Sequence, residues 1–543
     1  MRINQSNLAI IKQLLEGVCM AKWYENEELI KISVECDEAF AKNDRNKLNK
    51  LINLCWERGH DESLQPLERA KFLYNSFTCL SDWISLSIQE DIEFKKYYSN
   101  INGIRKYEAE YEKCFYLFRT SYGLSYPIYK DILKSDDEMD IAYFKGFYYS
   151  LIVNYSNLLW QCGRIIRALD ILNQISATNF SMALGNLGLK ISDYADLDYD
   201  TGHKPILYQK AYEKLSKSLD CDNMYPEAKV VFSMKKEELE TWFGLDYLQH
   251  PYDFPMDIDN LNERNYREWC ANQVLSLNTL NDVHPGLGAG YDPLHLPSIV
   301  ESIQTGIIPR YHGLFNQIKQ EYVSARFFAY EGLTIREPHF SDKDVFLVNT
   351  LDYPVYGLGI EKVKAAYRSV YAIFDRVAYF LNKYFDLGIP EWEVSYKRIW
   401  NPNSKDKNKL SNIVEKNYPL LGLWWIFKDI NNKSIADINK RIDPVMSKVS
   451  QVRNAMEHRY FKILDNLSNS SSNDRIDNFA YRISFEEFEA LTIALMKNAR
   501  EVIILLVMSI YAAENIREKK RSPKEMIGQM FTTQYDDEWK QIF

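Results

Sequence analysis

Apolar residues recur every three or four positions along most of the chain, which is the spacing of helices that bury one face. In residues 146–175 small and large apolar residues follow this spacing on two predicted helices, with Gly163 at the turn between them. Such placement is typical of a tetratricopeptide repeat (TPR) in degenerate form. A looser copy follows at 182–219, and an earlier helix pair is predicted for 46–92. We therefore predict a TPR-like helical repeat domain over residues 1–244, with a non-repetitive helical domain as the alternative.

The pattern changes after residue 244. Residues 245–350 are rich in Pro, Asn, Asp and Gly, and two helices are predicted there, around 262–275 and 312–333. This segment ends in "SDKDVFLVNTLDYPVYG", which favours extended structure before a Pro turn. We interpret residues 245–350 as a mixed connector region between two helical domains.

Residues 351–543 have the pattern of a four-helix bundle. Helices are predicted at 359–387, at 411–430, from Asp443 to 464, and from Ser484 to about 518. Ser484 with Glu487 three residues later predicts a capping box at the start of the fourth helix. The predicted fold class of the whole chain is all-α.

The third of these helices, "SKVSQVRNAMEHRYFKIL" at 447–464, carries a group of polar residues. At about 100° per residue, its apolar stripe centres near Met456, and Arg453 lies on the flank of that stripe. Asn454 and His458 are about 40° apart, on the side away from the stripe. The helix therefore directs an amide and an imidazole together towards water or towards a partner.

These three side chains are sufficient for RNA cleavage without a metal ion. Arg453 offers a permanent charge and planar donors that match phosphate geometry. The imidazole of His458 can take or give a proton near neutral pH, so it can activate the 2′-hydroxyl that attacks the neighbouring phosphate. Asn454 can orient a substrate oxygen or fix the imidazole tautomer. The alternative is an ordinary solvated face on which His458 pairs with a nearby carboxylate.

Asp375 is a further candidate on the first bundle helix. It interrupts an apolar row that contains Tyr371, and a carboxylate at the border of a core is costly unless it has a partner. A structural ion pair with Arg368 or Arg376 is the alternative to a functional role.

Composition adds three constraints. The 543 residues carry a net charge of −9, but residues 361–543 are net positive at +5, which weakly favours a polyanionic ligand there. The eight cysteines lack CxxC spacing, which indicates a reducing cytoplasm and buried thiols, not a zinc site. The N-terminus shows no signal peptide, and the apolar run at 502–513 is too short to span a membrane. We expect a cytoplasmic location, no membrane association, no metal and no cofactor.

The sequence "RNAMEH" at 453–458, on the third helix of a C-terminal bundle, resembles the motif of the HEPN superfamily (higher eukaryote and prokaryote nucleotide-binding). Residues 266–282, 325–333 and 349–385 are similar to a bacterial HEPN family whose N-terminal half contains repeats. The resemblance implies a metal-independent endoribonuclease in which two bundles pair, so that both copies of the motif line one composite cleft. It also implies growth arrest, because many such proteins are toxins or anti-phage effectors that cut tRNA or other cellular RNA.

The resemblance assigns roles to individual residues. Arg453 and His458 correspond to the catalytic pair, Asn454 to the polar residue after the arginine, and Asp375 to the acidic residue of the first helix. A further set is expected to bind RNA: Tyr460, Arg459, Lys519, Lys520 and Arg521. The basic residues of this set that end the fourth helix can instead interact with the helix dipole.

The expected partners are RNA, a second copy of the chain through the HEPN domain, and a trigger or regulator bound by the N-terminal repeats. Two other interpretations remain open. One is a non-catalytic RNA- or protein-binding scaffold whose HEPN bundle only dimerises. The other is a toxin that a nucleotidyltransferase silences by modification of Tyr460.

Overall fold

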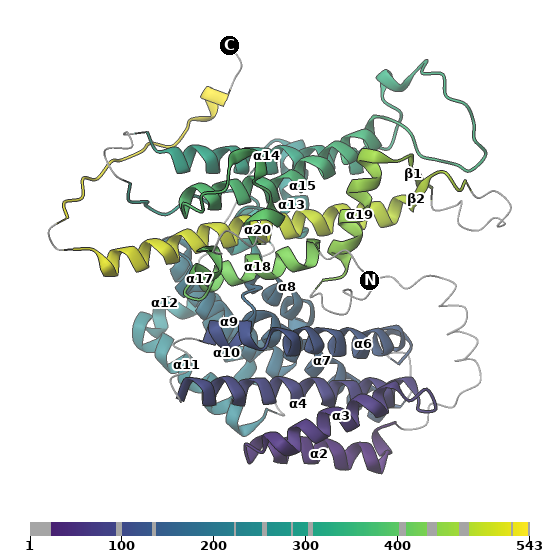
Figure 1. Cartoon of the computed structure of the whole chain (residues 1–543), viewed down its shortest axis with the longest axis vertical. Coiled ribbons are helices and arrows are strands. Elements are labelled where there is room, and N and C mark those ends of the chain that lie inside the picture. The colour runs from purple at the N-terminus through teal and green to yellow at the C-terminus, as the bar shows by residue number, and fades with distance from the viewer. Residues whose placement is uncertain are drawn as a thin grey trace.

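The structure is a computed structural model that describes residues 23–93, 100–132, 137–221, 224–251, 258–283, 286–301, 308–400, 409–431, 443–465, 477–522 and 525–540. The predicted all-α fold class is confirmed, because nearly all regular structure in these residues is helical. Figure 1 shows the N-terminal helices in the lower half of the molecule and the C-terminal helices in the upper half.

The N-terminal region consists of successive helices that pack against their neighbours in the sequence. They are η1 (Trp23–Glu25), α2 (Glu27–Ala41), α3 (Arg45–His60), α4 (Pro66–Glu93), α5 (Asn100–Lys106), α6 (Glu108–Ile132), α7 (Glu138–Gln161), α8 (Ile165–Ser176), α9 (Ser181–Leu197), α10 (His203–Leu219), α11 (Pro226–Phe243) and α12 (Leu245–Gln249). The helix pairs predicted at 46–92 and 146–175 are present as α3 with α4 and α7 with α8. Their assignment to the TPR class stays a prediction.

The predicted connector contains the two expected helices. They are α13 (Leu261–Asn272) and α14 (Arg310–Thr334), with the short turns η2 (Thr279–Asp282), η3 (Leu287–Ala289) and η5 (Phe340–Asp342). Helix α14 packs along α15 (Leu358–Tyr384), the first helix of the predicted bundle. This packing makes α14 a structural part of the C-terminal bundle, although the sequence pattern separates the two.

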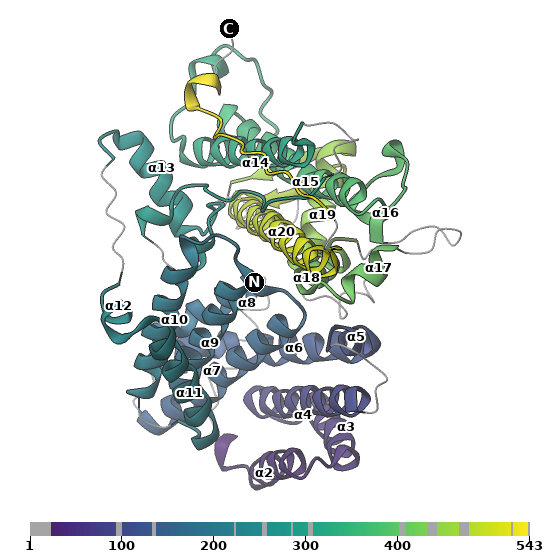
Figure 2. The ribbon, with the colours of Figure 1, turned by 90° about the vertical axis from the view of Figure 1, so that its left-hand side faces the viewer.

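The rest of the C-terminal region surrounds one long helix. Its elements are η6 (Glu391–Glu393), α16 (Tyr396–Trp400), α17 (Lys409–Val414), α18 (Tyr418–Asn431), α19 (Val445–His458), β1 (Phe461–Leu464), β2 (Tyr481–Ser484), α20 (Phe485–Lys520) and η10 (Asp537–Lys540). Figure 2 looks nearly along α20, which lies between α14 and α15 above and α18 below. The apolar run inside α20 is fully buried from Val502 to Val507. No helix in the part of the chain that the structure describes is long and apolar enough to cross a membrane.

Two predicted helices differ from those observed. The third helix was expected to reach residue 464, but α19 ends at His458, where Arg459 adopts an extended conformation (φ −136°, ψ 165°). Residues 461–464 form β1, which pairs in parallel with β2, so Tyr460 does not continue the helical stripe. The second predicted helix is divided into α17 and α18. Oδ1 of Asn417 accepts from the N–H of Leu420 at 3.2 Å and so caps α18, and Pro419 lies in the first turn, where a helix does not need its N–H.

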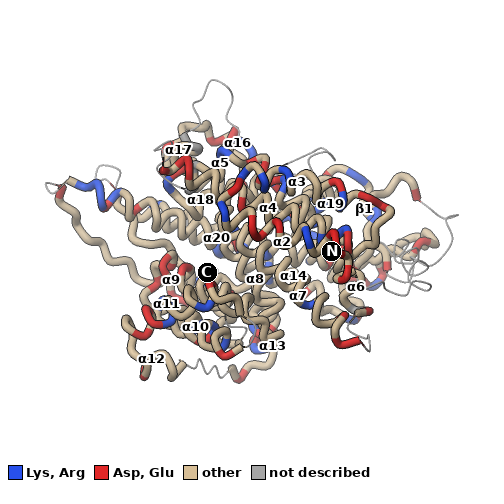
Figure 3. The backbone as a smooth tube through the Cα atoms, turned by 90° about the horizontal axis from the view of Figure 1, so that it is seen from below, with Lys and Arg blue, Asp and Glu red and all other residues tan. Residues whose placement is uncertain are grey.

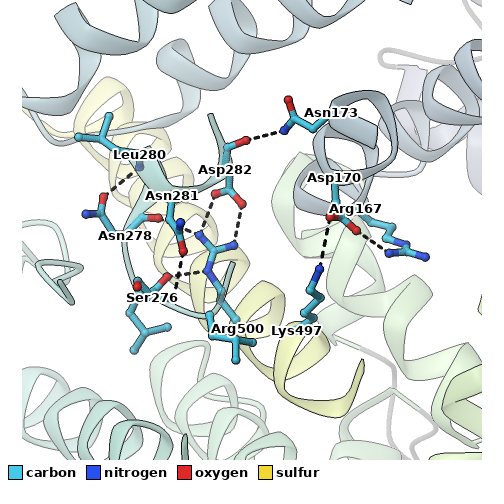
Figure 4. Close-up of polar contacts among 12 residues, drawn as sticks. Arg167, Asp170, Asn173, Ser276, Asn278, Leu280, Asn281, Asp282, Lys497 and Arg500 are labelled. Atoms are coloured by element: carbon cyan, nitrogen blue, oxygen red, sulfur yellow. Dashed lines mark hydrogen bonds and ion pairs between the residues drawn. The ribbon is translucent and has the colours of Figure 1, made fainter. Parts of the chain in front are cut away.

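Ion pairs and hydrogen bonds join the N-terminal helices, the predicted connector and α20. The guanidinium of Arg500 donates to both carboxylate oxygens of Asp282, at 2.6 and 3.0 Å, and Asn173 of α8 donates to the Asp282 carbonyl at 2.7 Å (Figure 4). Lys497 contacts Asp170 of α8 beside this group. These contacts fix α8 and the connector against the middle of α20.

A second junction lies where the turn between α7 and α8 meets α18. Arg164 is fully buried and pairs with Asp429 and with Glu501, each at 2.9 Å. Beside it Gly163 has φ +73°, and a Cβ on Gly163 would lie 2.7 Å from the backbone nitrogen of Gly422. Two chain segments far apart in sequence therefore meet backbone to backbone at this point.

Candidate functional site

The predicted motif lies at the C-terminal end of α19. Val452 and Met456 are buried, whereas Asn454 and His458 are exposed and Arg453 is half-buried. This distribution agrees with the helical geometry expected from the sequence. In the part of the chain that the structure describes, the His458 imidazole makes no hydrogen bond or ion pair, so both of its nitrogens face solvent or a partner.

Arg453 is held by two uncharged groups. Its Nη1 donates to Oδ1 of Asn454 at 3.2 Å, and its guanidinium carbon lies 5.4 Å from the ring centroid of Tyr371 on α15. The Tyr371 hydroxyl donates in turn to Oγ of Ser450 on α19, at 3.4 Å. Burial raises the pKa of Tyr371, so its hydroxyl stays protonated at neutral pH. Asn454 therefore contacts the arginine and not the imidazole.

The helix end that carries His458 is attached to α15. Nε of Arg368 lies 2.9 Å from Oε1 of Glu457, and Nη2 of the same arginine donates to the Met456 carbonyl at 3.3 Å. The last four carbonyls of a helix lack intrahelical hydrogen-bond partners, and Arg368 provides a donor for one of them, the Met456 carbonyl.

Asp375 is exposed on α15, one turn beyond Tyr371. Its Oδ1 accepts a hydrogen bond from the backbone N–H of Tyr396 at 2.8 Å, at the start of α16. The alternative of an ion pair with Arg368 or Arg376 is not observed, because these arginines pair with Glu457 and Glu321. The carboxylate thus anchors α16, and its catalytic role stays a prediction.

Arg459 and Tyr460 follow the motif and are both exposed. The Tyr460 carbonyl accepts from the N–H of Tyr481 at 2.8 Å, which ties this residue to β2. The ammonium of Lys462 lies 5.1 Å from the Tyr460 ring centroid. The two residues therefore present a basic and an aromatic side chain beside His458, as an RNA-binding role requires.

Lys462 is a residue that the sequence did not single out. It is only 3% exposed, and its ammonium pairs with Asp352 at 2.7 Å and with Asp477 at 2.8 Å. Burial alone would lower the pKa of Lys462, but its hydrogen bonds to Asp352, Asp477 and Tyr460 raise it above the usual value. Lys462 joins three separate segments next to the motif: the loop before α15, β1, and the chain that leads into β2.

Lys519, Lys520 and Arg521 lie at the opposite end of α20 from the motif, so the structure does not bring them to it within one chain. The motif end of α20 is fixed by the ion pair between Lys448 of α19 and Glu487. At 1.5 Å per residue, the two ends are about 50 Å apart. In Figure 3 a blue segment marks the outer end of α20, away from α19 and β1. Arg521 instead helps line a cavity of about 430 Å³ with Arg310 and Arg517.

An apolar loop also projects near the motif, before α15. Its exposed residues include Val345, Phe346, Leu347 and Val348, and Phe346 is 95% exposed. The end of the loop is fixed to β1, because the N–H of Val355 donates to the Ile463 carbonyl at 2.8 Å.

The chemistry available at the motif is that of a guanidinium, an imidazole and an amide on an open surface. Among the described residues, no group of three or more His, Cys, Asp or Glu is placed to hold a metal ion. All seven cysteines in the described part of the chain are free thiols, and six of them are buried. Cys19 lies outside the described residues.

Comparison with known protein families gives one match. Residues 303–513, less than half of the chain, match the family model described as LA2681-like HEPN. No curated protein and no solved structure matches the chain. The matched range begins just before α14, includes α15, α18 and α19, and ends within α20. The C-terminal part of this protein is therefore similar to the HEPN superfamily over residues 303–513, and the Arg453–His458 motif lies within the matched range.

Proposed function

We propose that this protein is a metal-independent endoribonuclease whose active site forms when two HEPN domains pair. The observation that carries the proposal is the exposure of His458 and Asn454 on one side of α19, with the Arg453 guanidinium held beside them and not engaged by a carboxylate. A motif used only for packing would be buried or neutralised by ion pairs. The HEPN match of residues 303–513 supports the same function.

In the proposed reaction, the His458 imidazole removes the proton of a ribose 2′-hydroxyl. The 2′-oxygen attacks the neighbouring phosphorus, and the bond from phosphorus to the 5′-oxygen breaks. The products are a 2′,3′-cyclic phosphate and a 5′-hydroxyl, whose proton comes from the second His458 of the dimer. Arg453 stabilises the negative charge that develops on the non-bridging oxygens.

Pairing of two chains accounts for the open position of the motif. One imidazole cannot act as base and acid in the same step, whereas two copies facing each other supply both groups. Arg459 and Tyr460 would border the shared cleft and contact the RNA strand on either side of the cut. Asp375 stands as a further proposed member of the site.

The proposed biological role is that of a toxin or anti-phage effector in the cytoplasm that cuts tRNA or other cellular RNA. The helical repeats over residues 1–244 would sense a trigger or restrain the nuclease, and residues 245–350 would transmit its state. The domain limits, with the HEPN domain at 351–543, belong to this proposal.

A second candidate function is a non-catalytic scaffold that binds RNA or protein. The exposed apolar loop at 345–348 favours it, because such a segment offers a docking surface that does not depend on the motif. The two functions differ in whether His458 is needed for the effect on RNA.

The deciding experiment is cleavage of total tRNA and of a labelled single-stranded RNA in the presence of EDTA. We expect His458→Ala and Arg453→Ala each to lower the rate by at least about 100-fold, since proton transfer and charge stabilisation each contribute that much. The matched control is His250→Ala, an exposed histidine outside the HEPN domain, which should cut at the wild-type rate.

The ends of the products provide a second check. A 2′,3′-cyclic phosphate, identified by mass spectrometry, agrees with the proposed attack. Equal cleavage by wild type and His458→Ala would contradict the proposal. Because an absent trigger can silence the purified protein, growth arrest on overexpression is compared for the same variants.

A further inference from the structure

The way Arg453 is held differs from that of the arginines on α15. Arg368 and Arg376 are both paired with a carboxylate. Arg453 makes no ion pair with any described residue. An arginine held by neutral groups keeps its whole positive charge for an anionic ligand, whereas an ion pair would cancel part of that charge.

Tyr371 is the larger of the two neutral contacts. Its ring is half-buried against Phe374 (centroids 6.0 Å apart), and its hydroxyl bonds to Ser450, three residues before Arg453 on α19. The ring is therefore fixed at both ends, to α15 by its backbone and to α19 by its hydroxyl. Its face lies 5.4 Å from the guanidinium carbon, which is within cation–π distance.

Asn454 limits the guanidinium from a second side. Its Oδ1 accepts from Nη1 of Arg453 at 3.2 Å. A free arginine side chain samples many rotamers, and its ordering costs entropy each time it binds an anion. The two neutral contacts restrict this freedom in advance, and no carboxylate of a described residue occupies the remaining guanidinium donors.

We infer that Tyr371, acting with Asn454, is a positioning residue that holds the Arg453 guanidinium ready for the phosphate oxygens. This inference rests on the proposed function. Tyr371 touches no reacting atom; its ring sets the direction of the guanidinium without reducing its charge. Asn454 likewise positions the arginine and not the imidazole of His458.

The test compares Tyr371→Leu, Tyr371→Phe and Tyr379→Leu in RNA cleavage. Tyr379 is the matched control, because it lies on the same helix, is half-buried, and has the Lys383 ammonium 5.3 Å from its ring centroid. We expect Tyr371→Leu to lower kcat about tenfold and to change KM less than about twofold, since the arginine acts most on the transition state. Tyr371→Phe keeps the ring but loses the hydrogen bond to Ser450, so its kcat should lie between those of Tyr371→Leu and wild type, whereas Tyr379→Leu should stay within about twofold of wild type.

A second measurement does not depend on cleavage. Phenylglyoxal modifies accessible guanidinium groups, and the rate at Arg453 is read by peptide mass spectrometry. Arg453 should react at least about threefold faster in Tyr371→Leu than in wild type, Tyr371→Phe or Tyr379→Leu, because the ring covers one face of the guanidinium. If Tyr371→Leu fails to fold, the exposed variant Asn454→Ala replaces it, with the same expected changes.

The outcomes separate the two proposals. Equal modification rates in Tyr371→Leu and Tyr379→Leu overturn the positioning role, whatever the nuclease assay shows. If the modification rates differ as expected but the wild type neither cuts RNA nor arrests growth, the proposed nuclease function fails and the positioning of Arg453 stands.

Discussion

Arg453 and Lys462 are two cations within ten residues of each other that are used in different ways. Arg453 is contacted by neutral groups and keeps its charge for a ligand, whereas Lys462 is buried between Asp352 and Asp477. The first arrangement suits binding, and the second suits the attachment of separate chain segments. Neither the residue type nor its position in the sequence distinguishes the two uses.

We expect Lys462→Met to lower the free energy of unfolding by about 3 kcal/mol, because removal of the lysine leaves two carboxylates facing each other in a largely buried site. Urea denaturation followed by circular dichroism measures the change. The matched control is Lys448→Met. The ion pair of Lys448 with Glu487 is nearly half exposed, so its loss should lower the free energy of unfolding by no more than about 1 kcal/mol. A Lys462 effect no larger than that of the control would contradict this role.

The same pair of variants predicts a pH dependence. The Lys462 ammonium lowers the pKa of Asp477, and it lowers the pKa of Asp352 against the opposing effect of burial. A carboxyl group whose pKa is lower in the folded state stabilises the fold at pH values above its pKa in the unfolded state, about 4. This contribution is lost as the pH falls through the pKa of the folded state. The stability difference between wild type and Lys462→Met should therefore shrink as the pH is lowered from 5 to about 3.

At the scale of single elements, the C-terminal end of α19 depends on α15. Arg368→Met removes the ion pair with Glu457 and the hydrogen bond to the Met456 carbonyl. We expect the free energy of local opening at this helix end to fall by about 1 kcal/mol. The backbone amides of 455–460 should therefore exchange roughly fivefold faster. Hydrogen exchange with mass spectrometry measures this change.

Arg376→Met is the matched control for that experiment. Arg376 lies on the same helix and makes a similar exposed ion pair, with Glu321 of α14. Its loss should leave the exchange of 455–460 unchanged. Equal exchange in both variants would show that the Arg368 contacts do not stabilise the helix end.

Element boundaries show where the sequence was informative. Long periodic helices such as α15 and α20 were predicted almost to their ends, because their apolar residues follow one period for many turns. The end of α19 was predicted six residues too late. Tyr460 and Ile463 fit the helical stripe, but Phe461 and Ile463 also fit the alternation of a strand, and pairing with the distant β2 decides between the two structures.

The candidate site was predictable to a similar extent. The outward direction of Asn454 and His458 follows from helix geometry alone, so the sequence was sufficient for it. The contacts of Tyr371 and Arg368 with α19 join residues about 80 positions apart, which no local pattern encodes. The sequence did place Tyr371 in the apolar row that Asp375 interrupts. Its contact with the Arg453 guanidinium depends on the packing of α15 against α19, which the sequence pattern does not show.

At the scale of the whole molecule, Arg164 connects the N-terminal helices to α18 and α20. Arg164→Met should lower the free energy of unfolding by about 3–5 kcal/mol, because it removes the buried cation that pairs with both Asp429 and Glu501. Thermal unfolding followed by calorimetry measures the loss. Arg167→Met is the matched control, since its ion pair with Asp170 is partly exposed and should contribute about 1 kcal/mol or less. A loss for Arg164→Met as small as that of the control would contradict this role.

The position of α20 in the chain has a consequence for biosynthesis. Glu501, which pairs with Arg164, follows it by 337 residues. At about 5–20 residues per second, a ribosome needs roughly 20 to 70 s to add that length of chain. During this interval the nascent N-terminal helices can fold, but the Arg164 guanidinium at their docking surface lacks Glu501, its final partner. Docking of the N-terminal helices is therefore completed only after Glu501 has been synthesised, which is later than the synthesis of the Arg453–His458 motif.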